Sequence, residues 1–388
     1  MTTLSDVMAV LERAYPARLA ESWDSVGLVC GDPDDPVTSV LSCVDVTDAV
    51  VDRALANGVD LIVAHHPLLL RGVDTVGTHT PKGRLVHRLI RGGCALYTAH
   101  TNADSANPGV SDALAALLGL TGVRPLEPKP AVPMDKWSVF VPTADAATVR
   151  EALFAAGAGE IGDYSHCCWS TSGTGQFLPG ASADPAVGEV GEVTRVTEDR
   201  VEMVAKRSVR NDVLIALRTA HPYEVPAFDL MEMAAGHSDE GLGRVGELPE
   251  PVTLAEFTTI VAASLPSAPV GIRAAGDPEL VVRTVAVCGG AGDSLLDAAR
   301  SSGADVYLTG DLRHHPVDEH LRNGRPALID AGHWGTEFPW CTQVRDLLAE
   351  EMPELDATVF TDPTDPWTIH RSGSGPVTGT VARMPSRR

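Results

Sequence analysis

Lysine and arginine are scarce in this sequence relative to its acids. The 388 residues include 30 Lys and Arg against 52 Asp and Glu, which gives a formal net charge of −22. Binding to a phosphate backbone needs clustered basic residues, so we expect no nucleic-acid partner. The longest apolar stretches, such as 61–64 and 68–70, are far too short to cross a bilayer, so we expect no membrane partner either.

Cysteine is also sparse and irregularly spaced. The seven cysteines are odd in number and form no C-x-x-C pair, which argues against a disulfide framework and against a structural zinc knuckle. The opening residues 1–23 lack the basic start, apolar core and cleavage site of a secretory signal, and their apolar spacing is that of an amphipathic helix. We therefore expect a cytoplasmic protein.

The first and last thirds of the chain alternate strand-like and helix-like segments. The strand-like segments are 37–46, 59–64, 94–99, 281–288, 304–310 and 325–331. The helix-like segments between them are 48–58, 83–93, 293–303 and 317–324. This alternation predicts parallel βαβ units and therefore an α/β fold.

The two thirds are also similar to each other. An offset of 245 residues gives six identities in 22 aligned positions, including the pairs Cys43/Cys288 and Asp60/Asp305. Chance similarity between two βαβ units is the alternative. The shared order of elements favours an internal repeat, so we expect two similar halves that form one domain.

The middle of the chain has a different pattern. Prolines at 125, 128, 130 and 133 predict a linker. The segments beyond it predict the order βαββαβ of a ferredoxin-like domain: 137–142, 145–157, 166–177, 200–208, 211–221 and 225–233. The expected organisation is a first half-domain, an inserted domain, a second half-domain and a disordered tail, at 1–130, 131–235, 236–372 and 373–388.

Three segments place metal-ligating residue types at predicted strand ends. His65 and His66 follow the buried strand 59–64, where open parallel sheets bind their ligands. Two imidazoles there suit zinc or another transition metal, and ordinary core or surface histidines without a metal are the alternative for such a pair.

The next strand ends in His100, with Asp104 four residues further on. The two oxygens of a carboxylate can bridge two cations, although Asp104 can also be a helix N-cap. In the last third, His333 and Glu337 have the i, i+4 spacing that places two side chains on one helix face.

Together these residues form a mixed nitrogen and oxygen set that can hold two divalent cations. Zinc, iron, manganese, cobalt and nickel are all chemically admissible. Two such cations lower the pKa of a bound water and polarise a substrate oxygen, as in dinuclear hydrolases. His100 and His315 are our candidates for catalytic proton transfer, and Asp311 and His314 lie in the same segment as His315. The glycine-rich segment 287–294 lacks nucleotide-loop spacing, so we interpret it as a tight turn.

Six segments occur in the order seen in one known family. They are AESWDSVGL (20–28), DLIVAHHP (60–67), YTAHTNAD (97–104), GVSDALA (109–115), ADVYLTGD (304–311) and DAGHWGTE (330–337). On these motifs, residues 1–370 resemble the NIF-three-like family, whose members are also labelled GTP cyclohydrolase I type 2 homologues. Segments 162–179 and 220–229 are similar to the inserted domain of its longer bacterial members, which resembles PII and CutA proteins.

The resemblance implies a dinuclear metal site on a two-half α/β domain that assembles into a homohexamer. The family's paired histidines, bridging aspartate and C-terminal histidine and glutamate match five positions: His65, His66, Asp104, His333 and Glu337. Ser25 stands where the family usually has a hydrophobic residue or Asn, which is a minor departure.

Two functions follow from these observations and both stay open. The first is a metal-dependent hydrolase of the GTP cyclohydrolase or phosphoesterase type, acting on a small molecule for which a nucleotide is one candidate. The second is a non-enzymatic metal carrier or a regulatory, ligand-sensing scaffold, which the inserted segment favours.

Overall fold

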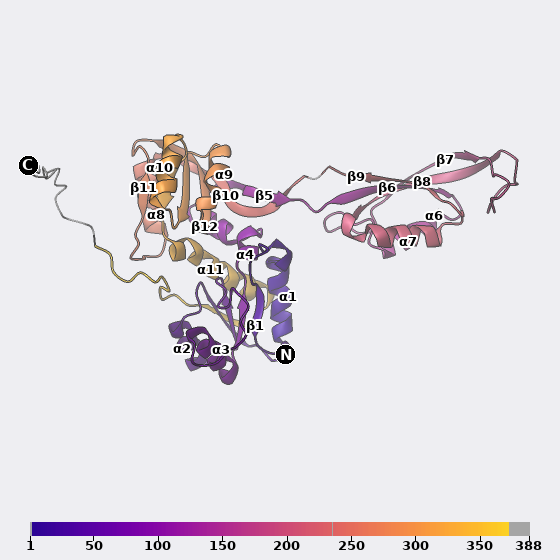
Figure 1. Cartoon of the computed structure of the whole chain (residues 1–388). Helices are drawn as coiled ribbons and strands as arrows, with labels where there is room; N and C mark the ends of the chain where they lie inside the picture. Colours follow the sequence, from indigo (N-terminus) through magenta and orange to yellow (C-terminus); the bar gives the residue numbers. More distant parts are fainter. Residues whose placement is uncertain (1, 235, 372–388) are drawn as a thin grey trace, which may run out of the picture. The chain divides into compact units, whose positions relative to one another are not determined.

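The computed structural model describes residues 2–234 and 236–371, so the predicted tail at 373–388 lies outside the described residues. The chain divides into two compact units (Figure 1). One unit combines Met1–Pro128 with Asp239–Arg388, and the other is Lys129–Ser238. Within the described ranges, no helix is both long and apolar enough to cross a membrane.

The first unit contains a five-stranded sheet in the order β1-β4-β3-β2-β15. Its strands are β1 (Gly27–Cys30), β2 (Ser39–Cys43), β3 (Leu61–Ala64), β4 (Ala95–Thr98) and β15 (Asp356–Val359). All neighbours pair in parallel except β1 with β4. The accompanying helices are α1 (Leu4–Ala14), η1 (Ala17–Leu19), α2 (Asp48–Ala56), α3 (Pro81–Gly92), α4 (Thr101–Ser105) and α5 (Val110–Leu117). Every residue of β3 and β4 is buried, which explains their uninterrupted apolar sequences.

The same unit contains a second sheet in the order β11-β14-β13-β12-β10-β5. Its strands are β5 (Thr121–Pro130), β10 (His237–Thr253), β11 (Arg273–Ala275), β12 (Val281–Ala291), β13 (Val306–Gly310) and β14 (Ala327–Asp330). Strands β12, β13 and β14 are parallel, as the βαβ pattern predicts. The associated helices are α8 (Leu254–Ser264), η3 (Asp293–Leu295), α9 (Leu296–Ser301), α10 (His314–Arg322) and α11 (His333–Glu351).

Two aspartates related by the 245-residue offset make the same hydrogen bonds in the two sheets. Asp60 accepts the backbone N–H groups of Thr38 and Ser39. Asp305 accepts those of Arg283 and Thr284, which are the residues at the same offset. The two aspartates therefore have equivalent positions in the two sheets. Asp60 links the start of β3 to the start of β2, and Asp305 links the start of β13 to the first residues of β12.

Helix α11 lies between the two sheets and packs against strands of both (Figure 1). Its buried face includes Trp340, Cys341, Val344 and Leu348, which belong to the core beneath the first sheet. This burial fixes the helix axis and so fixes where its first turn, with His333, meets the first sheet.

The second unit is an antiparallel sheet with two helices on one face (Figure 1). Its elements in chain order are β6 (Met134–Pro142), α6 (Ala146–Ala155), β7 (Trp169–Phe177), β8 (Thr194–Lys206), η2 (Arg207–Val209), α7 (Arg210–Ala220) and β9 (Ala227–Glu232). The sheet order is β7-β8-β6-β9. Alternate residues of β6 and β8, such as Trp137, Val139 and Val201, form its core with the helices.

The proline-rich segment contains the boundary between the two units, which falls after Pro128, and most of the segment is a strand. Pro125, Pro128 and Pro130 all lie in β5, which is the outermost strand of the second sheet. Proline is tolerated there because an edge strand leaves one row of backbone groups without a neighbouring strand. Pro133 follows β5 in an irregular stretch, so the segment joins the two units although part of it is a strand, which its proline content did not indicate.

Candidate metal centre

Four histidines meet where the carboxyl ends of β3 and β4 face the first turn of α11. His65 and His66 follow β3 directly, His100 follows β4, and His333 opens α11. The ring centroid of His65 lies 5.1 Å from that of His66 and 5.2 Å from that of His100, and the centroids of His66 and His333 are 5.1 Å apart. The strand-end placement that the sequence predicts thus brings side chains from distant segments together.

Each of the four imidazoles is held at Nδ1 by an oxygen that can only accept a hydrogen bond. The pairs are His65 with the Ala99 carbonyl at 2.9 Å, His66 with Asp45 at 2.7 Å, His100 with Asp24 at 2.8 Å and His333 with Asp311 at 2.7 Å. Nδ1 must therefore carry the proton and donate it, which leaves Nε2 of the neutral ring with a free lone pair. Histidines that ligate metals in proteins are oriented in this way.

The carboxylate of Glu337 lies among these Nε2 atoms. Its oxygens are 3.1 Å from Nε2 of His66, 3.1 Å from Nε2 of His333 and 3.5 Å from Nε2 of His65. Nε2 of His66 and Nε2 of His333 are 3.2 Å apart. Two ligand atoms bonded to one tetrahedral cation at ~2.0–2.1 Å are themselves about 3.3 Å apart, so these separations have the size that a shared cation requires.

Asp104 lies at the edge of this group. Its Oδ1 is 3.7 Å from Nε2 of His65, and its side chain comes from α4. His100 occupies the N-cap position of α4 and Gly109 that of α5, so the alternative interpretation of Asp104 as a helix cap is wrong.

Two atoms of the centre are buried without a hydrogen bond among the described residues. They are Nε2 of His65 and Oε2 of Glu337. Buried polar atoms are almost always partnered, so unpaired ones at a site need an explanation. Groups of three ligands here are close enough to hold a metal ion: His65, His66 and His100, and His66, His333 and Glu337. Imidazole nitrogens with a carboxylate fit a divalent transition metal, and a cation would satisfy both unpaired atoms.

The acids and histidines shift each other's protonation strongly. Burial alone would lower the pKa of His66, but the charges of Glu337 and Asp45 outweigh it and raise this pKa to about 11. The pKa of His333 rises to about 9 against the same opposing effect of burial. Burial raises the pKa of Glu337, but the three histidines around it lower it well below its ordinary value. These histidines therefore hold protons at neutral pH that a divalent cation would have to displace.

The glycine-rich segment 287–294 is not simply the tight turn that the sequence predicts, because Gly289 and Gly290 lie in β12. Gly290 has φ 66°, a conformation that side chains rarely adopt, and a Cβ there would lie 2.2 Å from Oε1 of Glu337. Its N–H donates to Thr336 on α11. The end of β12 thus leaves room for the Glu337 carboxylate because it has glycine at position 290.

The two histidines predicted to move protons have different positions. His100 belongs to the cluster, where its ring also meets the edge of the Trp23 ring, with the centroids 6.0 Å apart. His315 is exposed at the start of α10, and its ring contacts that of His314. A role for His315 in proton transfer stays a prediction.

Sequence reasoning gave no role to Asp24 or Asp45, although both orient a histidine. Asp45 comes just after β2, at the same edge of the sheet as His65 and His66, so the strand-end rule that identified the histidines applies to it as well. Asp24 lies inside the segment 20–28 that carries the family resemblance. Asp311 was named only as a neighbour of His315, and its unusual φ of 56° points its carboxylate at His333.

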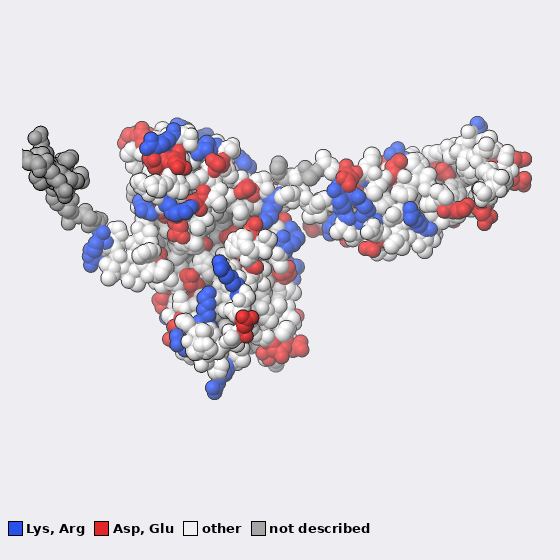
Figure 2. Space-filling view, in the orientation of Figure 1, with Lys and Arg blue, Asp and Glu red and all other residues white. Residues whose placement is uncertain are grey.

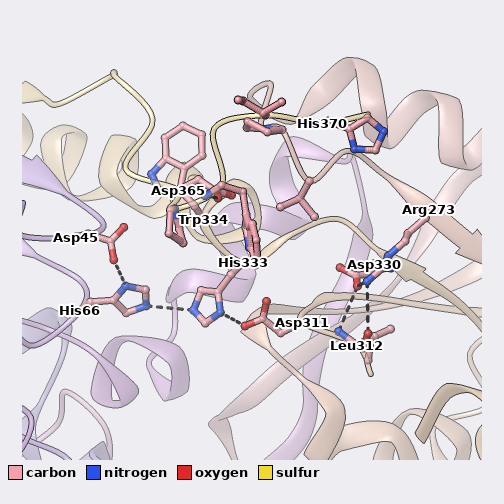
Figure 3. A pocket seen from close by; sticks show the side chains of 15 residues that line it. Asp45, His66, Arg273, Asp311, Leu312, Asp330, His333, Trp334, Asp365 and His370 are labelled. Carbon is pink, nitrogen blue, oxygen red and sulfur yellow. Dashed lines mark hydrogen bonds and ion pairs between the residues drawn. The ribbon is translucent and has the colours of Figure 1, made fainter. Parts of the chain in front are cut away.

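A cavity of about 830 Å³ opens on one side of the centre (Figure 3). His66 and His333 form one part of its wall, with Asp45 beside His66 and Asp311 beside His333. The centre is therefore accessible to a small molecule and not sealed in the core.

The fold and the His/Glu groups define an α/β protein able to hold a metal ion, and comparison with known proteins gives its family. The family model Duf34/NIF3 (NGG1p interacting factor 3) matches residues 2–366. The chain belongs to this family, which confirms the resemblance seen in the motifs.

Several relatives match along nearly their whole length. A protein of Mycobacterium tuberculosis named "GTP cyclohydrolase 1 type 2 homolog" is 57% identical over 373 residues, covering 95% of this chain and 98% of that protein. A Bacillus subtilis protein of the same name is 40% identical, covering 86% and 88%. The crystal structure of a Bacillus cereus protein related to NIF3 has a TM-score of 0.76 at 36% identity, covering 95% and 99%. That of Staphylococcus aureus protein SA1388 has a TM-score of 0.80 at 27% identity, covering 95% and 98%.

Proposed function

We propose that this protein is a metal-dependent hydrolase with two divalent cations at the His/Glu centre. The observation that carries the proposal is the common orientation of the four histidines, each held at Nδ1 so that Nε2 is free. Structural histidines in a core have no reason to share one tautomer and one direction, whereas metal ligands do.

The donor atoms also suggest how two cations would be shared. His66 appears in both ligand groups, but its Nδ1 is committed to Asp45, so its single remaining lone pair can serve one cation only. A carboxylate would suit a position shared by two cations, because each of its two oxygens can bind one cation. Glu337 and Asp104 are the carboxylates that lie within 3.7 Å of Nε2 of His65.

Divalent cations bound here would supply a water of lowered pKa and polarise a substrate oxygen. The chain's own side chains would orient the histidines and transfer protons. Asp45 and Asp311 orient His66 and His333, and Asp24 orients His100. Nε2 of His100 would serve either as a ligand beside His65 and His66 or in proton transfer, and we propose the second role for it. The name carried by the relatives makes GTP the first substrate to test.

The remaining parts of the proposal concern architecture and assembly. We propose a two-half α/β domain, supported by the matching hydrogen bonds of Asp60 and Asp305. The unit at 129–238 would be an inserted ferredoxin-like domain, as its element order β6-α6-β7-β8-α7-β9 suggests. We further propose a homohexamer in the cytoplasm, on the family resemblance and on the seven free cysteines, which suit a reducing compartment.

The test combines metal analysis with a substrate screen. Purified protein should contain about two divalent cations per chain, and the double variant His333→Ala/Glu337→Ala should contain fewer. His87→Ala, on the exposed side of α3, is the matched control and should keep its metal. Metal-loaded protein should hydrolyse GTP, another nucleotide or a phosphoester, and chelation should stop it. Unchanged metal content in the double variant would exclude the site.

A second candidate function is a ligand-sensing metal protein without catalysis. It is favoured by a cavity of about 400 Å³ within the second unit, whose wall includes Phe177, Glu198 and Tyr223. Exchangeable metal, a small molecule bound to that unit and no turnover across the substrate screen would favour this function over the hydrolase.

A further inference from the structure

The cavity of about 400 Å³ in the second unit shares no residue with the metal centre, and every residue that lines it lies within that unit. Its wall is formed by β6, by the end of β7 and the segment that follows it, by β8, and by the segment that leads into β9. Most of this wall is apolar, with three aromatic side chains at Phe140, Phe177 and Tyr223. The cavity therefore has the size and the lining of a small-molecule site.

The rings of Phe177 and Tyr223 stand at a steep angle to each other, with their centroids 5.8 Å apart and their planes at 64°. Tyr223 is fixed at two atoms. Its hydroxyl donates to Oε1 of Glu198 at 2.8 Å, and its backbone N–H donates to Nδ1 of His221 at 3.1 Å. Burial and the hydrogen bond to Glu198 raise the pKa of this hydroxyl, so it stays protonated and keeps donating. Two aromatic rings and a carboxylate thus meet in one fixed arrangement.

The carboxylate of Glu198 has a second oxygen that is not used within the protein. Oε1 accepts from Tyr223, whereas Oε2 has no hydrogen-bond or ion-pair partner within the described ranges of the chain. A Cβ at Gly175, on the neighbouring strand β7, would collide with Oε2, so glycine at that position leaves room for the carboxylate. A half-buried carboxylate with a free oxygen can form a charge-assisted hydrogen bond or an ion pair with a cationic ligand.

The charged residues of this wall are all acidic. They are Asp184, Glu198 and Glu224, and no Lys, Arg or His is among the described residues that line the cavity. In the described chain these three carboxylates do not form a group close enough to hold a metal ion. Their charge repels an anion, and the apolar remainder of the wall cannot replace the water around a metal ion. The wall fits an organic cation that carries apolar surface of its own.

One basic side chain, Arg200, lines a second cavity that shares Phe140 and Glu198 with this one. Its guanidinium pairs with Glu202 at 2.7 Å and lies 5.8 Å from the centroid of the Phe140 ring. It makes no ion pair with Glu198 among the described residues, so no direct pair cancels the charge of that carboxylate. Because the Phe140 ring already contacts a cation, the two other aromatic rings are the ones available to a ligand.

We propose that this cavity binds a small organic cation with an alkylated ammonium group, held by the Glu198 carboxylate and the rings of Phe177 and Tyr223. An aromatic face attracts a cation through its quadrupole, and the alkyl groups of such a cation can pack against the apolar wall. This site does not depend on the metal centre or on the proposed hydrolase activity. A ligand of this class is what the second candidate function, ligand sensing, requires.

The test compares choline with 3,3-dimethyl-1-butanol, which has the same shape but no charge. Ligand-observed NMR titrations on the full-length protein should show choline binding at least about 10-fold more tightly than the alcohol. Glu198→Gln removes the carboxylate charge and Tyr223→Leu removes a ring, so each should weaken choline binding by about 10-fold. Tyr223→Phe keeps the ring and should bind choline within about threefold of the unchanged protein.

Two matched controls change the same residue types away from the cavity. Glu151→Gln lies on the exposed surface of α6, and Tyr164→Leu replaces a side chain that is 75% exposed. Both should bind choline as the unchanged protein does. If Tyr223→Leu does not fold, Glu198→Gln and Tyr223→Phe still decide the result.

An organic-cation site is excluded if choline does not bind, or if the alcohol binds as tightly, because the cavity is then only apolar. It is also excluded if Glu198→Gln or folded Tyr223→Leu binds choline as the unchanged protein does. Displacement of choline by magnesium chloride, but not by sodium chloride of equal ionic strength, would show that the carboxylates bind a metal ion instead. Metal content of the same samples judges the proposed hydrolase separately. Full metal occupancy without choline binding rejects only the cation site, whereas choline binding without metal rejects only the metal centre.

Discussion

Nε2 of His66 and Nε2 of His333 lie 3.2 Å apart, although 267 residues separate them in the chain. Both rings point these atoms at each other because Asp45 and Asp311 hold their opposite nitrogens. Two imidazoles facing each other in this way repel when both are protonated. Glu337 offsets that repulsion in the metal-free protein, and a divalent cation would remove it by taking both lone pairs.

This arrangement predicts opposite pH dependences for metal-free and metal-loaded protein. Without metal, the folded-state pKa of His333 is about 9 and that of His66 about 11, both above the ordinary value of 6.5. Raised pKa values contribute stability that is complete below pH 6.5 and is lost as the pH rises to the folded-state pKa, about 9 for His333 and about 11 for His66. The metal-free protein should therefore lose stability between pH 6.5 and 9.

Metal-loaded protein should behave differently over the same range. Metal binding releases the histidine protons, so rising pH favours the metal-bound state. The free energy of unfolding of the metal-loaded protein should therefore stay level or increase. Urea unfolding at a series of pH values, with and without chelator, measures both slopes. Parallel slopes would show that the histidines do not exchange protons for metal.

Asp45→Asn should weaken metal binding without removing a ligand. The substitution replaces the carboxylate that fixes the tautomer of His66, and such losses typically cost ~10–100-fold in metal affinity. At saturating metal the stoichiometry should be unchanged. Competition with a coloured chelator gives the affinity, and Asp346→Asn, which changes an aspartate on the exposed surface of α11, is the control. An affinity within twofold of the unchanged protein would contradict the orienting role.

Gly290→Ala should disturb the metal centre because the added methyl group would clash with the Glu337 carboxylate. The added Cβ meets Glu337 at 2.2 Å and the backbone has φ 66°, so we expect a stability loss of ~2–4 kcal/mol and reduced metal content. Gly303→Ala is the matched control because its φ is 78° but nothing lies within 4 Å of a Cβ there. It should cost only about 1 kcal/mol from the backbone and keep its metal. Equal effects of the two variants would mean that the contact with Glu337 does not matter.

Asp60 and Asp305 should contribute similar amounts to the free energy of unfolding. Asp60→Asn and Asp305→Asn each weaken two hydrogen bonds from backbone N–H groups to a charged acceptor, so each should cost about 1–3 kcal/mol. Asp52→Asn, an exposed partner of Arg88, should cost less than about 1 kcal/mol. Thermal unfolding compares all three. A large difference between the two repeated positions would argue against their equivalence.

The large negative charge of the chain does not by itself locate the candidate metal site. Figure 2 shows basic and acidic side chains interspersed on the visible face of the described chain. Only two acids, Asp104 and Glu337, were needed for the predicted ligand set, and three more, Asp24, Asp45 and Asp311, orient the histidines. A large negative charge is thus compatible with a cation site but does not locate it.

The sequence by itself determined the local elements and the strand ends that carry the ligands. Apolar runs placed β3 and β4 correctly, because burial dictates those patterns, and the i, i+4 spacing of His333 and Glu337 agrees with their place in α11. The prolines near the boundary between the two units did not indicate that 121–130 is a strand, since the position of a strand within its sheet is not encoded locally. Only the tertiary structure showed that Asp45, Asp24 and Gly290 belong to the centre. Their contacts are with residues from other segments, and they arise when α11 packs against both sheets.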